Sequence, residues 1–105
     1  MIPQSQVSTQ ITSNKKGLVI AVEGYFNGAL HAAFRDSFEG QPKFERYAVS
    51  LQHCLGLDSG GLGLLLVLRD YSGLGKENLL LTQIPPEIKT VLRYANFDQI
   101  FTIVE

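Results

Sequence analysis

Leu55-Gly56-Leu57-Asp58-Ser59-Gly60-Gly61-Leu62-Gly63, followed by Leu64-Leu65-Leu66-Val67-Leu68, is the stretch around which the chain is organised. We interpret it as a loop that leads into a leucine-rich helix over about residues 59–71, with Asp58 or Ser59 at the N-cap. Asp and Ser suit that position because their side-chain oxygens accept hydrogen bonds from the free N–H groups of the first helical turn. The helix dipole also favours negative charge there. We therefore expect the Ser59 hydroxyl to be the functional group of the protein.

Length and composition restrict the classes of protein to which the chain can belong. Its 105 residues predict one domain over residues 1–105 with one core. A net charge of −1, with the basic residues scattered, gives no electrostatic case for nucleic-acid binding. The single cysteine, Cys54, excludes an internal disulfide and a cysteine cluster for zinc.

The chain shows no targeting or membrane signal. The segment 1–5 lacks the basic and apolar regions of a signal peptide. No apolar run approaches the roughly 18 residues that span a bilayer. We expect a cytoplasmic protein that does not insert directly into a membrane.

Apolar periodicity predicts an α/β protein. Residues 5–13 alternate at Val7, Thr9 and Ile11, as in an edge strand, and the continuous apolar run 18–22 predicts a strand buried on both faces. Five segments have strand patterns: 5–13, 18–22, about 47–51, 78–82 and 101–104. Three have helix patterns: about 28–39, 59–71 and 86–96.

The helix patterns come with end signals. Asn27 is a candidate N-cap for the first helix, which places Leu30, Phe34 and Phe38 on one face. The last helix begins with proline and has the clearest apolar stripe, formed by Ile88, Val91, Leu92 and Ala95.

The order β-β-α-β-α-β-α-β predicts a mixed, mostly parallel sheet of about five strands with helices packed on it. Sites in such sheets lie outside the carboxyl ends of the strands. The Asn27 loop and the Asp58-Ser59 loop both connect a strand to a helix, so we expect them to meet at the same edge.

Enzyme motifs are absent or incomplete. A dinucleotide-binding fingerprint needs glycine where Leu66 stands, and a nucleophile elbow around Ser59 needs glycine at Leu57 as well as at Gly61. His53 and Cys54 are adjacent, so on a strand they face opposite sides and do not form a nucleophile–base pair. We predict a protein that is not an enzyme and that has no catalytic residue, cofactor or metal site.

The leucine-rich helix has more apolar residues than one buried face needs. A helix that is apolar on nearly every side is either surrounded by protein or presents a patch to a partner. Helices of a small α/β domain lie outside the sheet, so some of these leucines are expected at the surface: Leu62, Leu64, Leu65, Leu66 and Leu68. The sequence thus favours a protein-binding surface beside Ser59.

Asp58-Ser59-Gly60-Gly61-Leu62-Gly63 resembles the Asp-Ser-Ser/Thr-Gly-Leu-Gly signature of STAS domains, in particular of bacterial anti-sigma-factor antagonists, at five of six positions. The resemblance extends to the loop Gly24–Asn27, the order of elements and the late proline-started helix. Two positions depart from the pattern: Gly60 replaces the second Ser or Thr, and Asn27 stands where an acid is common.

The resemblance implies a phosphorylation switch. In such antagonists the serine after the Asp, here Ser59, is phosphorylated by a partner that is both an anti-sigma factor and a serine-protein kinase of the histidine-kinase-like ATPase type. The unphosphorylated antagonist binds this partner, and a PP2C-type phosphatase restores it. By the same resemblance the partner-binding residues are Asn27, Asp58, Ser59, Gly60, Gly61 and Leu62.

Two alternatives remain open. The chain could be a non-switching STAS subunit that regulates a transporter or another complex. It could also be a small enzyme that binds a nucleotide or another small molecule at its glycine-containing loop, although only that loop supports this reading.

Overall fold

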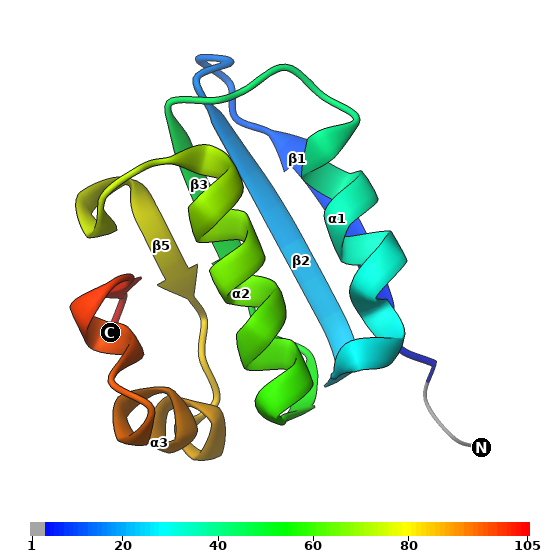
Figure 1. Ribbon diagram of the computed structural model, residues 1–105, viewed down its shortest axis with the longest axis vertical. Helices are drawn as coiled ribbons and strands as arrows, with labels where there is room; N and C mark the ends of the chain where they lie inside the picture. Colours follow the sequence, from blue (N-terminus) through cyan, green and yellow to red (C-terminus); the bar gives the residue numbers. More distant parts are fainter. Residues whose placement is uncertain (1–3) are drawn as a thin grey trace.

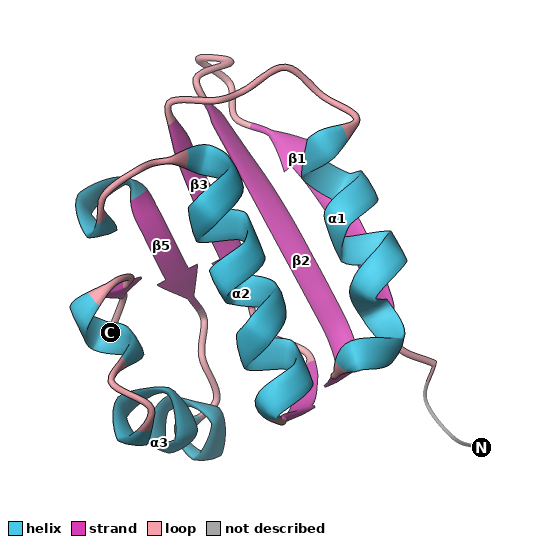
Figure 2. Ribbon diagram, in the orientation of Figure 1, coloured by secondary structure: helices cyan, strands magenta, loops and turns pink. Residues whose placement is uncertain are grey.

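The computed structural model describes residues 4–105 and shows a mixed sheet with helices packed on it (Figures 1 and 2). The interpretation of segment 1–5 concerns mostly residues outside this range. The strands are β1 (Gln6–Ile11), β2 (Gly17–Phe26), β3 (Arg46–Ser50), β4 (Cys54–Leu57), β5 (Leu79–Thr82) and β6 (Thr102–Ile103). The α-helices are α1 (His31–Glu39), α2 (Ser59–Ser72) and α3 (Pro86–Tyr94), and the short 3₁₀ helices are Gly28–Leu30, Lys76–Asn78 and Phe97–Gln99.

The sheet has the predicted α/β architecture, with the strand order β1-β2-β3-β5-β6. β1 pairs antiparallel with β2, whereas β3, β5 and β6 follow in parallel. The predicted mixed, mostly parallel sheet is therefore confirmed, with β1 and β2 as its antiparallel pair. None of the helices within residues 4–105 is long and apolar enough to cross a bilayer.

The core lies on the face of the sheet that α1 and α2 cover (Figure 1). Strand register places buried side chains of three neighbouring strands in rows, for example Leu18, Tyr47 and Leu79. The prediction that 18–22 is buried on both faces is wrong, because Val19 and Ala21 on the opposite face are only half-buried.

Strand β4 is not among the five strands predicted from the sequence. β2 has ten residues, and β3 pairs only with its first half, Gly17 to Ala21. The backbone of Gly24 to Phe26 is left to pair with β4, across a register shift between Gly24 and Tyr25. The segment 55–57, which we interpreted as part of a loop, is therefore a strand.

The predicted helices form with shifted ends. The first begins with the 3₁₀ turn Gly28–Leu30, and Phe34 and Phe38 are buried as predicted. The last ends at Tyr94, and its stripe is narrower than predicted: Ile88 and Leu92 are buried, whereas Val91 and Ala95 are exposed.

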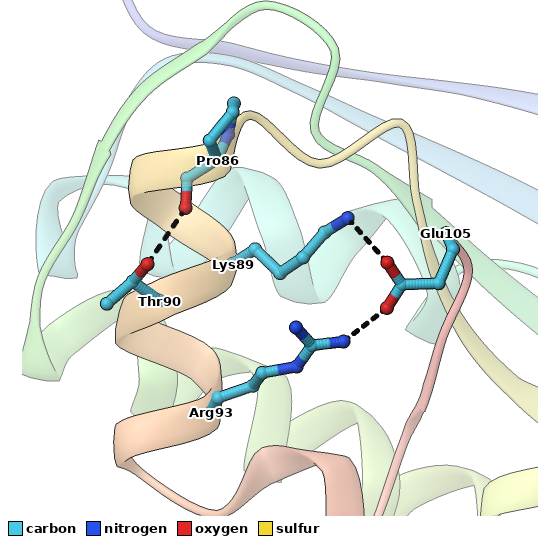
Figure 3. Close-up of polar contacts among 5 residues, drawn as sticks. All are labelled: Pro86, Lys89, Thr90, Arg93 and Glu105. Carbon is cyan, nitrogen blue, oxygen red and sulfur yellow. Dashed lines mark hydrogen bonds and ion pairs between the residues drawn. The ribbon is translucent and has the colours of Figure 1, made fainter.

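The end of the chain is held against α3. The Glu105 carboxylate accepts a hydrogen bond from Lys89 Nζ at 3.1 Å and pairs with the Arg93 guanidinium (Figure 3). These two partners, Lys89 first, hold the pKa of Glu105 below its usual range. On the same helix the Thr90 hydroxyl donates to the Pro86 carbonyl.

Candidate functional site

Asp58 is the N-cap of α2. Its backbone is extended, and its carboxylate Oδ1 accepts a hydrogen bond from the Gly61 N–H at 3.1 Å. Its carbonyl accepts from the Leu62 N–H at 3.0 Å, which closes the first turn of the helix. Of the two predicted cap candidates the structure therefore selects Asp58, and Ser59 is the first helical residue.

Asn27 caps the neighbouring helical segment in a similar way. Its Oδ1 accepts a hydrogen bond from the Ala29 N–H at 2.9 Å, and its carbonyl accepts from the Leu30 N–H. The predicted capping role of Asn27 is confirmed. An amide is a neutral cap, so among residues 4–105 the only carboxylate that caps a helix at this edge is that of Asp58.

The two capped loops touch each other through glycines. A Cβ built on Gly60 would lie 2.7 Å from the backbone nitrogen of Gly28. A Cβ on Gly61 would overlap the carbonyl oxygen of Phe26 and would crowd Leu57. The predicted meeting of the Asn27 and Asp58-Ser59 loops at one edge is confirmed, and it depends on the small size of Gly60 and Gly61.

Ser59 is exposed at the start of α2. Among the residues that the structure describes, no side chain is hydrogen-bonded to its hydroxyl. Within residues 4–105 no three His, Cys, Asp or Glu side chains are grouped closely enough to hold a metal ion. The hydroxyl is thus accessible to a partner, and the open helix start tolerates added negative charge.

Helix α2 separates its leucines between two faces. Gly61, Leu64, Leu65 and Leu68 are buried against the core. Leu62 is partly buried and Leu66 is exposed, and at 100° per residue both lie on the same side of the helix as Ser59. The predicted apolar surface beside Ser59 exists, but it comprises two of the five leucines.

Two exposed apolar side chains that the sequence analysis missed lie beside this edge. Tyr25 and Leu55 are about half exposed, 47% and 55%, on the paired strands β2 and β4. A shallow depression of about 180 Å³ lies between these strands and the two caps, lined by Tyr25, Phe26, Asn27, Gly56, Leu57 and Asp58. The sequence signal for these exposed side chains was the short apolar segment 54–57. Its pairing with β2 is a tertiary feature, which the sequence pattern does not show.

The histidine and cysteine before this edge have ordinary positions. His53 is exposed in the turn before β4, and its carbonyl accepts from the Gly24 N–H at 3.0 Å. Cys54 is buried, and burial raises the pKa of its thiol, which favours the protonated, unreactive form. Cys54 is thus a small buried apolar residue of the core.

Comparison with known proteins identifies the family. A scan against models of protein families finds no match. A STAS-domain containing protein of Pseudomonas aeruginosa strain UCBPP-PA14 is 38% identical over 89 residues, which cover 82% of this chain and 86% of that protein. The chain belongs to the STAS-domain family.

Solved structures agree with the fold. The anti-sigma factor antagonist SpoIIAA in its unphosphorylated form superposes with a TM-score of 0.67, at 14% identity, over 94% of this chain and 87% of that one. An anti-sigma factor antagonist from Mycobacterium paratuberculosis gives a TM-score of 0.64, at 21% identity, over 93% and 85% of the two chains. At these identities the similarity establishes the shared fold.

Proposed function

We propose that this protein is an anti-sigma-factor antagonist that works by partner switching, with Ser59 as the residue that is phosphorylated. The observation that carries the proposal is the Ser59 hydroxyl, which is exposed at the capped start of α2 and is hydrogen-bonded to no side chain within residues 4–105. An exposed hydroxyl at a helix start is suited to be a substrate of another protein's chemistry. The STAS fold and the antagonists among the structural neighbours support the same role.

The partner of the unphosphorylated form is an anti-sigma factor that is also a serine-protein kinase of the histidine-kinase-like ATPase type. Its contact surface comprises Asn27, Asp58, Ser59, Gly60 and Leu62, extended by the exposed apolar side chains around them. Gly61, which the sequence also placed on this surface, is buried against Phe26 and does not reach the partner. Phosphorylation adds about −1.5 to −2 charges at Ser59. Burying this charge among apolar groups without a partner costs several kcal/mol, so the phosphorylated form dissociates.

The fold itself needs no rearrangement for this switch. Phosphate oxygens at Ser59 lie at the positive end of the α2 dipole, where the free N–H groups of the first turn stabilise them. Phosphorylation changes only the charge of the surface that the partner contacts. A PP2C-type phosphatase reverses the modification, and the antagonist itself is not an enzyme.

The direct test is phosphate mapping. The purified protein is incubated with ATP and a serine-protein kinase of the histidine-kinase-like ATPase type from the same organism, and the modified residue is identified by mass spectrometry. We expect one phosphate, on Ser59, and none on the Ser59→Ala variant. Ser72, at the other end of α2, provides a matched control, because Ser72→Ala is expected to leave the modification unchanged. Phosphate on another residue, or none, would contradict the proposal.

A binding measurement separates this role from the second candidate, a non-switching STAS subunit of a transporter or another complex. We expect Ser59→Ala to bind the kinase like the wild type and Ser59→Asp to bind at least about tenfold more weakly, a difference of about 1.4 kcal/mol. Equal binding of both variants, together with an unchanged response of Ser59→Ala to the upstream signal, would favour the non-switching subunit.

A further inference from the structure

Strand β1 is an open edge of the sheet without the usual protection. Within residues 4–105 it is the first strand in the order and pairs with β2 alone. Five of its six residues are exposed, and Gln6–Ile11 contains no charge, proline or glycine. Natural edge strands are commonly blocked by lysine, proline or a bulge because an unpaired edge is a template for another strand. β1 has none of these devices.

The hydrogen-bond pattern shows which backbone groups of β1 are free to pair. The Thr12 N–H donates to the Gly17 carbonyl at 2.9 Å, in the same register as the β1–β2 ladder. Hydrogen-bonded and non-hydrogen-bonded pairs alternate along an antiparallel ladder. The N–H and C=O groups of Val7, Thr9 and Ile11 therefore point away from β2, towards the open side.

We infer that β1 pairs antiparallel with β1 of a second copy of this chain, about a twofold axis at Thr9. In this register Thr9 lies opposite Thr9 of the second copy, and Val7 lies opposite Ile11. The open-side N–H and C=O groups of these three residues then form the new ladder. Ile11, which is 47% exposed in the single chain, becomes covered by Val7.

Self-complementarity argues for a second copy as the occupant. A twofold interface needs residues that match across its centre. About Thr9, apolar Val7 meets apolar Ile11 on the helix side, while polar Ser8 meets Gln10 on the open face of the sheet. No charge within the strand opposes the approach of an identical strand.

The helix that lies over this edge leaves room for the second copy. Arg35 and Glu39 line a hollow with Val67, Asp70 and Tyr71 of α2, so their side of α1 faces α2. At 100° per residue, Ala33 and Ser37 lie on the opposite side, towards the edge at β1. These small side chains allow two copies of α1 to approach across the joined sheet.

The pairing creates a weak dimer. A contact of two six-residue strands is smaller than the roughly 1,200–2,000 Å² that stable interfaces bury. We expect a monomer at low concentration and a dimer that grows with concentration. The strand centre at Thr9 pairs with Ile20, away from Phe26 and the Ser59 loop, so the dimer does not depend on the proposed function.

Sedimentation velocity of the full chain between about 10 µM and 1 mM tests the pairing. The wild type is expected to shift from monomer to dimer. Thr9→Pro removes a central donor of the new ladder but none of the β1–β2 ladder, so it should weaken the dimer at least tenfold with the circular dichroism spectrum unchanged. A wild type that stays monomeric, or a dimer that Thr9→Pro leaves intact, would overturn the inference.

Crosslinking tests the register without relying on proline. A hydrogen-bonded antiparallel pair has Cα atoms about 5.5 Å apart, within the range that a disulfide spans. Thr9→Cys should therefore oxidise to a covalent dimer at least tenfold faster than Gln52→Cys, which introduces a thiol in an exposed turn. Native Cys54 is buried and is the same in both variants. Equal rates would reject pairing about Thr9.

Discussion

Gly60 at the start of α2 faces the backbone of Gly28, and a Cβ added to Gly60 would lie 2.7 Å from the Gly28 nitrogen. The position where related signatures carry Ser or Thr is therefore a close contact between two loops in this protein. A Cβ added to Gly28, in contrast, meets nothing within 4 Å. A side chain at Gly60 would therefore be obstructed and one at Gly28 would not, which makes the two glycines a matched pair for mutagenesis.

Gly60→Ala is expected to push the Asn27–Gly28 loop away from α2, because the obstacle is backbone. Amide chemical shifts in a ¹⁵N-correlated NMR spectrum should change at residues 27–30 as well as around the substitution, with a loss of stability of about 1 kcal/mol. Gly28→Ala should leave the shifts of residues 58–61 nearly unchanged. Equal responses of both loops to the two variants would show that the contact is not tight.

Gly61→Ala is expected to destabilise the protein by at least about 2 kcal/mol, because its Cβ overlaps the Phe26 carbonyl and strand β2 is central to the sheet. Gly63→Ala is the control on the same helix. A Cβ at Gly63 meets nothing within 4 Å, so the higher helix propensity of alanine should raise the free energy of unfolding by about 0.5–1 kcal/mol. Urea unfolding measures both, and a neutral Gly61→Ala would contradict the packing described here.

Asp58→Ala is expected to cost about 1 kcal/mol through loss of the hydrogen bond from the Gly61 N–H. Asp58→Asn should retain most of this stability, because Asn is an equally good N-cap. The two variants also separate the capping role of Asp58 from a role of its charge. If the carboxylate charge takes part in phosphoryl transfer, Asp58→Asn is phosphorylated poorly in kinase assays although its unfolding curve stays close to that of the wild type.

Tyr25→Ala is expected to weaken binding of the anti-sigma-factor kinase at least tenfold, about 1.4 kcal/mol, because exposed aromatic side chains commonly dominate interfaces. Tyr94→Ala removes an even more exposed tyrosine, on α3, and should leave the affinity unchanged. Isothermal titration calorimetry measures both. Similar losses from the two variants would exclude a surface centred on the Ser59 edge.

The pH dependence of stability should report the Glu105 pair. The pKa of Glu105 is lower in the folded chain than in the unfolded chain, so the pair stabilises the protein above the unfolded pKa of about 4.3. That contribution is lost as the pH falls through the lower folded pKa. Glu105→Gln should therefore reduce Tm slightly at pH 7 and not at all in strong acid. The side chain is exposed, so the effect is small.

Local signals in the sequence predicted most of the elements near the site. Asn27 and Asp58 are caps because their short side chains reach N–H groups two or three residues ahead, a contact that depends only on neighbours in sequence. The same holds for α2, whose buried face follows the 3.6-residue period of its leucines.

Features that depend on distant partners were predicted less well. β4 has four residues, and it is a strand only because β2 extends beyond β3 and offers it free backbone groups. The pairing of β4 with β2 places Tyr25 and Leu55 at the surface. The apolar surface beside Asn27 therefore could not be predicted from the hydrophobic pattern of the sequence. Val19 is only half-buried because side chains alternate along β2 and those of Leu18 and Ile20 face the core. Val91 is exposed, whereas Ile88 and Leu92 of the same helix are buried.

The sequence alone determined the α/β class, the order of the predicted elements, the Asn27 cap and the placement of the Asp58-Ser59 pair at a helix start, because each follows from interactions within a few residues. Tertiary structure decided which surface surrounds that serine. The approach of Gly60 to Gly28 and the pairing of β4 with β2 join segments about thirty residues apart, and such contacts depend on how the whole sheet packs.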